Sequence, residues 1–169
     1  MGDARYPETI EIRPALPEDA DGITRTFLDS AKHHAELDPE RYWIPAAEVI
    51  TARYREGRQH PPGAGREVVT LVAVLGNEIV GFVDARLDRS PDPMHREIVY
   101  CHIVEIAVRG GQRGLGIGER LLTAAEEWGR ALGAHFASLE YHVANTRAGS
   151  FYEKRMGYRA AATTAIKRL

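Results

Sequence analysis

Three runs of apolar and β-branched residues dominate the middle of the chain. Residues 68–75 and 79–87 are two of these runs, and the dipeptide Gly76-Asn77 separates them. Two strand-like runs joined by Gly-Asn predict a β-hairpin. Residues 98–108 form the third run, which is long and mostly apolar, and its pattern predicts a buried strand. The centre of the chain is therefore expected to form a sheet.

Helical periodicity flanks these runs on both sides. Pro17 opens a helical pattern with acidic residues in its first turn, as is typical of a helix N-terminus. Residues 40–56 form a second, weaker helical pattern, in which Trp43 is an expected core contact. Residues 117–132 form the clearest amphipathic helix, with apolar positions on one face and charged positions on the other.

The remaining elements complete an order that is typical of an α/β fold. Residues 8–12 and 135–143 alternate and predict strands, and Asn145 is expected to cap a helix that continues to about Met156. Residues 158–169 are expected to form one or two closing strands. Antiparallel hairpins come early in the chain and a parallel crossover comes late, so we expect a mixed sheet covered by helices.

The composition fits one soluble domain over residues 1–169, in which residues 1–6 could be disordered. The 22 Lys and Arg residues nearly balance the 24 Asp and Glu residues, so no general attraction to nucleic acid or to an anionic membrane is expected. The longest run without a charged residue, 68–77, is too short to span a bilayer. The first residues of the sequence include several charged ones and no apolar run, so no signal peptide is expected. The single cysteine excludes an intramolecular disulfide and suits a cytoplasmic location.

The glycine-rich turn between the strand at 98–108 and the helix at 117–132 carries the strongest chemical signal. Five of the nine residues from Gly110 to Gly118 are glycine. Such a turn bends tightly and leaves peptide N–H groups at the positive end of a helix dipole, which suits a phosphate or a pyrophosphate. Arg109 and Arg113 add positive charge nearby. A glycine-rich connection without a ligand is the alternative.

The pattern of this turn restricts the phosphate ligand. A Walker loop is excluded because no Gly-Lys is followed by Ser or Thr. Gly114, Gly116 and Gly118 form Gly-x-Gly-x-Gly, whereas a dinucleotide fingerprint is Gly-x-Gly-x-x-Gly. Glu140 lies near the offset of a ribose-binding acid, but too little sequence follows the turn for a doubly wound sheet. A dinucleotide-binding enzyme is therefore the weaker alternative.

Two sequence blocks resemble the motifs of one known family. Arg113-x-x-Gly116-x-Gly118 resembles the acyl-CoA signature of the GNAT N-acetyltransferase superfamily. The block Asn145-x-x-Ala148-x-x-Phe151-Tyr152-Glu153-Lys154, followed by Gly157-Tyr158, resembles the second motif of that family. Arg155-Met156 adds one residue to the commonest form of this second motif. The resemblance implies an α/β fold with a mixed, mostly antiparallel central sheet, helices on both faces and a splayed strand pair at the cofactor site.

The resemblance also implies transfer of an acetyl group from acetyl-CoA to a primary amine. The pyrophosphate of coenzyme A would lie on the peptide N–H groups of residues 113–118, and the pantetheine arm would follow the strand that ends at Val108. A peptide N–H there, that of Ala107 or Val108, would polarise the thioester carbonyl. Asn145 could bind the arm or serve as a helix cap. The residues that the resemblance assigns to acetyl-CoA are Ile106, Ala107, Val108, Arg113, Gly114, Leu115, Gly116, Ile117, Gly118, Asn145 and Tyr152.

Two residues are expected to handle protons during the transfer. Tyr152 matches the general acid of the family, and a phenol is protonated at neutral pH and can donate to a departing thiolate. A purely structural aromatic anchor is the alternative for Tyr152. Glu105 stands between Ile103 and Ala107 in an apolar strand, where burial would raise the pKa of a carboxyl toward neutrality and suit a general base. An exposed or arginine-paired carboxylate is the alternative. Substitutes for the base are Tyr100, His102 and Glu140.

The identity of the acceptor is left open by the sequence. It could be an amine of a small molecule or of a protein. A cationic acceptor would be suited by the acidic residues Glu36, Asp38, Asp84 and Asp88. The histidines lack the spacing of a zinc site, so no metal is expected. An acyl-CoA-binding sensor without transfer activity is a further alternative. A homodimer is also open, because members of the family are often dimers.

Overall fold

The computed structural model describes residues 9–57, 67–90 and 93–168. The chain divides into two compact units, Met1–Leu139 and Glu140–Leu169. The larger unit holds the whole sheet and the smaller one holds short helical turns. The disorder expected at residues 1–6 lies outside the described residues.

The sheet of the larger unit has five strands in the order β1-β2-β3-β4-β5. The pairs from β1 to β4 are antiparallel, and only the pair of β4 with β5 is parallel. The predicted mixed, mostly antiparallel sheet is therefore confirmed, including the hairpin at Gly76-Asn77. The strands are β1 Glu11–Pro14, β2 Val68–Leu75, β3 Glu78–Arg89, β4 Val99–Val108 and β5 Phe136–Leu139.

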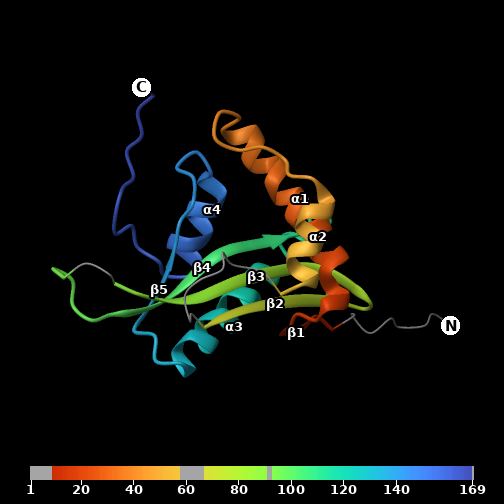
Figure 1. Cartoon of the computed structure of the whole chain (residues 1–169), viewed down its shortest axis with the longest axis horizontal. Helices are drawn as coiled ribbons and strands as arrows, with labels where there is room; N and C mark the ends of the chain where they lie inside the picture. The colour runs from red at the N-terminus through yellow and green to blue at the C-terminus, as the bar shows by residue number, and fades with distance from the viewer. Residues whose placement is uncertain (1–8, 58–66, 91–92, 169) are drawn as a thin grey trace. The chain divides into compact units, whose positions relative to one another are not determined.

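Helices cover both faces of this sheet, as the family resemblance implied. The elements α1 and α2 lie on one face and α3 on the other (Figure 1). Short 3₁₀ turns precede α1 and α3. The helical elements of the larger unit are η1 Pro17–Asp19, α1 Ala20–Leu37, α2 Ala47–Arg55, η2 Gly110–Gln112 and α3 Ile117–Ala131.

The helices pack on the two faces of the sheet in different ways: large aromatic rings fill one side, and a glycine permits close approach on the other. On the α1 and α2 side, the ring of Phe82 lies 6.4 Å from that of Phe27 and 5.6 Å from that of Tyr54. These rings are part of the main apolar core, and burial of such rings is the main stabilising contribution. On the other side, α3 approaches β4 so closely that a Cβ at Gly129 would lie 2.4 Å from the Cβ of Cys101. Only glycine therefore permits this contact.

A β-bulge in β4 changes which side of the sheet its side chains face. Asp84 pairs with Glu105 and Ala85 pairs with Ile103, so Val104 is an extra residue without a partner in β3. Residues two apart in a strand normally share a face, but an extra residue between them reverses the alternation. Glu105 therefore faces α1 while Ile103 faces α3.

The bulge also marks the point where β4 and β5 separate. Their ladder runs from Tyr100 opposite Phe136 to Ile103 opposite Leu139. Beyond it, β4 continues to Val108, and β3 is its only strand neighbour among the described residues. The family resemblance predicted such a splayed pair. The strand expected over 135–143 is correspondingly shorter, because β5 has no ladder partner past the bulge.

The second helix is also shorter than expected. Helix α2 begins at Ala47 rather than at residue 40. Pro45 explains the difference, since a proline disfavours helical backbone in the residue before it. Trp43 lies in the irregular segment that results and is 82% exposed. Its predicted core contact is therefore wrong.

The smaller unit contains α4 Thr146–Ser150 and the π-helical turn η3 Phe151–Arg155. The closing strands expected over 158–169 are wrong for residues 158–168, where the structure has no strand. Residues 159–168 are exposed, Ile166 among them. A run of small and polar residues has no apolar face to bury against a sheet, which accounts for the difference.

Candidate active site

The glycine-rich turn connects the end of β4 to the start of α3. Gly114 and Gly116 have φ angles of +87° and +77°. These values lie in the left-handed region, which residues other than glycine rarely adopt. Gly116 is the N-cap of α3, where no side chain supplies a capping bond. The two glycines therefore bend the chain so that α3 begins with open N–H groups.

The peptide N–H groups of this turn are available to a ligand. No acceptor in the described part of the chain takes a hydrogen bond from the N–H groups of residues 114–118. The first turn of a helix leaves such donors unsatisfied at the positive end of the helix dipole. Arg113 donates from Nε to the carbonyl of Val108 at 3.2 Å, which holds its guanidinium beside the turn. Arg109 instead pairs with Glu78 at 2.9 Å, so its charge is partly neutralised.

The space around the turn is open. A Cβ built at Gly110, Gly111, Gly114 or Gly116 would meet no atom within 4 Å. A ligand can therefore approach the backbone closely. Open space, left-handed glycines and unbonded N–H groups together fit a phosphate or diphosphate.

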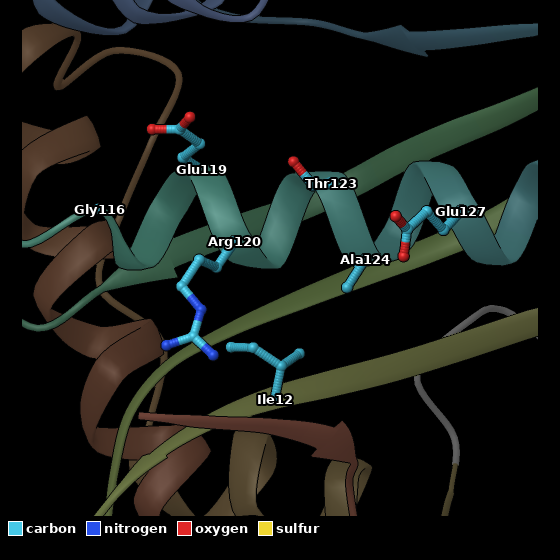
Figure 2. A pocket seen from close by; sticks show the side chains of 7 residues that line it. All are labelled: Ile12, Gly116, Glu119, Arg120, Thr123, Ala124 and Glu127. Atoms are coloured by element: carbon cyan, nitrogen blue, oxygen red, sulfur yellow. The ribbon is translucent and has the colours of Figure 1, made fainter. Parts of the chain in front are cut away.

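A shallow groove begins at Gly116 and follows α3. It has a volume of about 410 Å³. Figure 2 shows Arg120 extending from α3 toward Ile12 of β1, while Glu119 points to another side of the helix. Of the residues in the glycine-rich turn, only Gly116 lines this groove.

Glu105 lies in the part of β4 that leads to the turn. Its carboxylate accepts a hydrogen bond from Ser30 of α1 at 3.3 Å, and its side chain is half-buried. Burial, followed by the nearby charge of Asp84, raises the pKa of Glu105 to about 7. Burial penalises the ionised form and a second carboxylate repels it. Glu105 is thus a carboxyl that can both take and release a proton near neutrality.

Asp84 is a second buried carboxylate, directly opposite Glu105 in β3. It is 2% exposed. Tyr54 donates a hydrogen bond to one carboxylate oxygen at 2.7 Å, and Thr70 donates to the other at 2.6 Å. Burial raises the pKa of Asp84 to about 6, although both hydroxyls oppose this shift. The suggestion that Asp84 binds a cationic acceptor is therefore wrong, because it is enclosed and both its oxygens are bonded.

The sequence holds a local signal for Asp84 as well as for Glu105. Asp84 interrupts the apolar run of β3 in the same way that Glu105 interrupts β4. An ionisable residue inside a buried strand is expensive unless it has partners or a role. The same reasoning that selected Glu105 therefore applies to Asp84.

The substitutes for the base lie away from the glycine-rich turn or in the smaller unit. Tyr100 packs its ring 6.0 Å from that of Phe136. His102 shares a hydrogen bond of 3.0 Å with Ser138. Both residues precede the bulge in β4, and Glu140 belongs to the smaller unit. Ile106, Ala107 and Val108, by contrast, are the last residues of β4 and lead directly into the turn.

Tyr152 lies in an aromatic cluster of the smaller unit. It is buried, and its ring is 5.5 Å from Tyr141, 5.3 Å from Phe151 and 6.1 Å from Tyr158. The turn that carries it is π-helical, with Met156 donating its N–H to the carbonyl of Phe151. This wider turn accommodates the extra residue that distinguishes the motif from its commonest form. Such turns frequently occur at functional sites.

Asn145 caps α4, as the sequence predicted. Its Oδ1 accepts a hydrogen bond from the N–H of Ala148 at 3.1 Å. The cap uses only the oxygen of the amide and leaves the Nδ2 group as a donor. A contact of Asn145 with acetyl-CoA stays a prediction.

The structure thus groups the predicted site residues within each unit. Glu105, residues 106–108 and residues 113–118 belong to the larger unit, along one strand and the turn that follows it. Asn145 and Tyr152 belong to the smaller unit.

Residues 9–57, 67–90 and 93–168 contain no group of three or more His, Cys, Asp or Glu side chains arranged to hold a metal ion. Among the same residues, no helix has the length and apolar character that a membrane crossing requires. Cys101 is buried and donates to the carbonyl of Ala125 at 3.3 Å, and burial raises the pKa of its thiol to about 11.

Known proteins share both the sequence signature and the fold. Residues 24–158 match the model of the acetyltransferase (GNAT) family. A mutant of the BH1408 protein from Bacillus halodurans has a TM-score of 0.83 at 22% identity, over 94% of this chain and 99% of that one. AAC(6')-Iy, in complex with the bisubstrate analogue CoA-S-monomethyl-acetylneamine, has a TM-score of 0.67 at 17% identity, over 95% and 98% of the two chains.

A third structure is an aminoglycoside acetyltransferase, meta-AAC0020, from an uncultured soil metagenomic sample, in complex with trehalose. Its TM-score is 0.64 at 18% identity, over 95% of this chain and 96% of that one. No curated protein sequence matches the chain. The family match spans the glycine-rich turn, Glu105 and Tyr152. On this match, the chain belongs to the acetyltransferase (GNAT) family.

Proposed function

We propose that the protein transfers an acetyl group from acetyl-CoA to a primary amine of a small molecule or a protein, by direct attack of the amine on the thioester. The observation that carries the proposal is the row of unbonded N–H groups at residues 114–118, where β4 ends and α3 begins. The family membership supports acetyl transfer in general. A second structure of AAC(6')-Iy, in complex with CoA, supports acetyl-CoA as the donor.

The residues of the larger unit suit two parts of coenzyme A, the pyrophosphate and the pantetheine arm. The pyrophosphate would accept hydrogen bonds from the N–H groups of residues 113–118, beside the guanidinium of Arg113. The pantetheine arm would lie along residues 106–108, where the free edge of β4 can bond an extended chain. The N–H of Ala107 or Val108 would then polarise the thioester carbonyl. Asn145 is proposed to donate from Nδ2 to the arm.

The proton transfers are assigned to Glu105 and Tyr152. Glu105 takes the proton that the acceptor ammonium loses, which frees the nitrogen lone pair for attack on the carbonyl carbon. Its pKa of about 7 suits this task, since a base works best when its pKa is close to the working pH. Tyr152 gives a proton to the sulfur as the carbon–sulfur bond breaks. The nitrogen of the tetrahedral adduct still carries one extra proton, which it gives to the Tyr152 phenolate as the adduct collapses. The products are the acetylated amine and free coenzyme A, and Glu105 releases its proton to solvent.

Several aspects of this proposal rest on the sequence. The cytoplasmic location, the single-domain organisation over residues 1–169 and a homodimer stay predictions. The acceptor also stays open, although AAC(6')-Iy and meta-AAC0020 are both named as aminoglycoside acetyltransferases.

A release assay tests the proposal. The protein is mixed with acetyl-CoA and a panel of amines that includes aminoglycosides, polyamines, amino acids and peptides, and free thiol is followed over time. We expect thiol release and a matching acetylated product with at least one class. Binding of acetyl-CoA without release for any class would favour the sensor alternative. Displacement of acetyl-CoA by NADH would favour the dinucleotide-binding alternative.

A further inference from the structure

A buried chain of hydroxyl and carboxyl groups lies behind the proposed base. It runs from Tyr54 of α2 and Thr70 of β2 to Asp84 of β3, and Asp84 is the cross-strand partner of Glu105. Directly opposed residues of neighbouring strands project their side chains to the same face. Asp84 and Glu105 therefore lie beside each other on the face that α1 and α2 cover.

This arrangement is costly for a purely structural role. The partners of Asp84 are two neutral hydroxyls, and it stands beside a second acid rather than a base. A buried carboxylate without a cationic partner is destabilising, and a neutral side chain could bond the same hydroxyls at lower cost. Groups held in this way occur preferentially at functional sites.

We propose that Asp84 is a positioning residue of the acetyl-transfer reaction, which sets the proton affinity of Glu105 from the opposite strand while Tyr54 and Thr70 hold its carboxylate in place. The inference rests on the proposed role of Glu105 as the base. Asp84 itself has no access to acceptor or donor, because it is 2% exposed and both its oxygens are bonded.

Helices α1 and α2 and strand β2 each contribute polar or charged groups beside Asp84 and Glu105. Helix α1 contributes Ser30, whose carbonyl and hydroxyl both lie within hydrogen-bond distance of the Nδ1 atom of His34. Helix α2 contributes Tyr54 and the positive charge of Arg53, and β2 contributes Thr70. Arg53 favours ionisation of both acids, but burial outweighs it.

The two acids therefore titrate as a coupled pair. A charge on Asp84, which stands directly opposite in β3, makes removal of the proton from Glu105 harder. Without the charge on Asp84, Glu105 would lose its proton at a lower pH. A base with a lower pKa is already deprotonated at a lower pH, but it binds a proton less strongly.

The pH dependence of kcat/KM tests this inference. In Asp84→Asn, we expect the midpoint of the acid limb to move to lower pH by roughly one unit. The matched control is Asp88→Asn, on the same strand, since Asp88 pairs with Arg86 at 2.9 Å; its midpoint should not move. Tyr54→Phe removes one donor from Asp84, weakens its ionised form and should move the midpoint in the same direction by less. An unchanged midpoint in both Asp84→Asn and Tyr54→Phe would overturn the inference.

A second measurement does not depend on activity. Glutamate is labelled with ¹³C at the side-chain carboxyl, and the resonance that disappears in Glu105→Gln identifies Glu105. Its titration midpoint should fall in Asp84→Asn and stay unchanged in Asp88→Asn. A fall with no turnover on any amine would support the coupling and contradict the proposed function. An unchanged midpoint with normal turnover would contradict the role of Asp84 and leave acetyl transfer intact.

Discussion

Ile103 and Glu105 stand two residues apart in β4, yet they face opposite sides of the sheet. The cause is the bulge at Val104, which reverses the alternation of side chains. Ile103 is 4% exposed and packs on the side of α3, whereas Glu105 reaches Ser30 of α1. One inserted residue thus moves a carboxyl from the side of one helix to the side of another.

Loss of the carboxyl at Glu105 should slow the transfer without weakening the donor complex. We expect Glu105→Gln to lower kcat by about 10²- to 10⁴-fold, the usual contribution of a general base, because an amide cannot take a proton. In the unchanged protein, kcat/KM should fall as the pH drops through about 7, since the base must be deprotonated. Steady-state kinetics over a pH range would check both statements. A variant with full activity and the same profile would remove Glu105 from the mechanism.

Tyr152 gives a prediction with a matched control in the same aromatic cluster. Tyr152→Phe should lower kcat by about 10²-fold or more while the Kd for acetyl-CoA changes little, because only the proton donor is lost. Tyr158→Phe makes the same chemical change at a neighbouring ring, 6.1 Å away, and should retain most of the activity. Equal losses in the two variants would point to the packing of the cluster rather than to proton donation.

Substitutions at two glycines, one at each end of α3, distinguish the effect of backbone strain from an effect on ligand binding. Gly116 precedes the helix and Gly133 follows it, with φ angles of +77° and +87°, and a Cβ would meet no atom at either position. Alanine at each should therefore cost a similar 1–2 kcal/mol, roughly, of stability. Only Gly116→Ala should also weaken acetyl-CoA binding by calorimetry, because its methyl group enters the proposed diphosphate site. Equal affinities in the two variants would exclude the turn as the site.

The stability of the fold should respond to the two raised carboxyl pKa values. Asp84 and Glu105 bind protons more tightly in the folded chain, with pKa values of about 6 and about 7, than in the unfolded chain, at 3.8 and 4.5. Their contribution to stability is therefore fully present below the unfolded values and is lost as the pH rises through the folded values. Between about pH 4 and about pH 7, urea denaturation should show a steeper decline for the unchanged protein than for Asp84→Asn/Glu105→Gln. Parallel curves would contradict the raised pKa values.

Local patterns predicted the elements that depend on local signals. The hairpin at Gly76-Asn77, the amphipathic α3 and the cap at Asn145 each have their determinants within a few residues, and the structure contains all three. Glu105 was also identifiable, since an acid among apolar neighbours in a strand is conspicuous wherever the chain places it. The glycine-rich turn was also identifiable, because its glycines lie close together in the sequence between a predicted strand and a predicted helix.

Features that depend on distant residues were not predictable in this way. Tyr54 and Thr70 lie 30 and 14 positions from Asp84, so no local pattern could reveal that they bond its carboxylate. The bulge at Val104 follows from how β3 and β4 align, and the alternation of β4 alone suggests an ordinary strand. Trp43 was expected in the core because it is large and apolar, but Pro45 keeps the residues before it out of α2, and Trp43 is left exposed.

Glycine N–H resonances offer the most direct test of how the donor is bound. In protein labelled with ¹⁵N-glycine and titrated with acetyl-CoA, we expect large, saturable shifts for Gly114, Gly116 and Gly118. Gly57 and Gly133, which lie outside the turn, should hardly move. Saturable binding that leaves the three turn resonances in place, or no binding at all, would contradict the account.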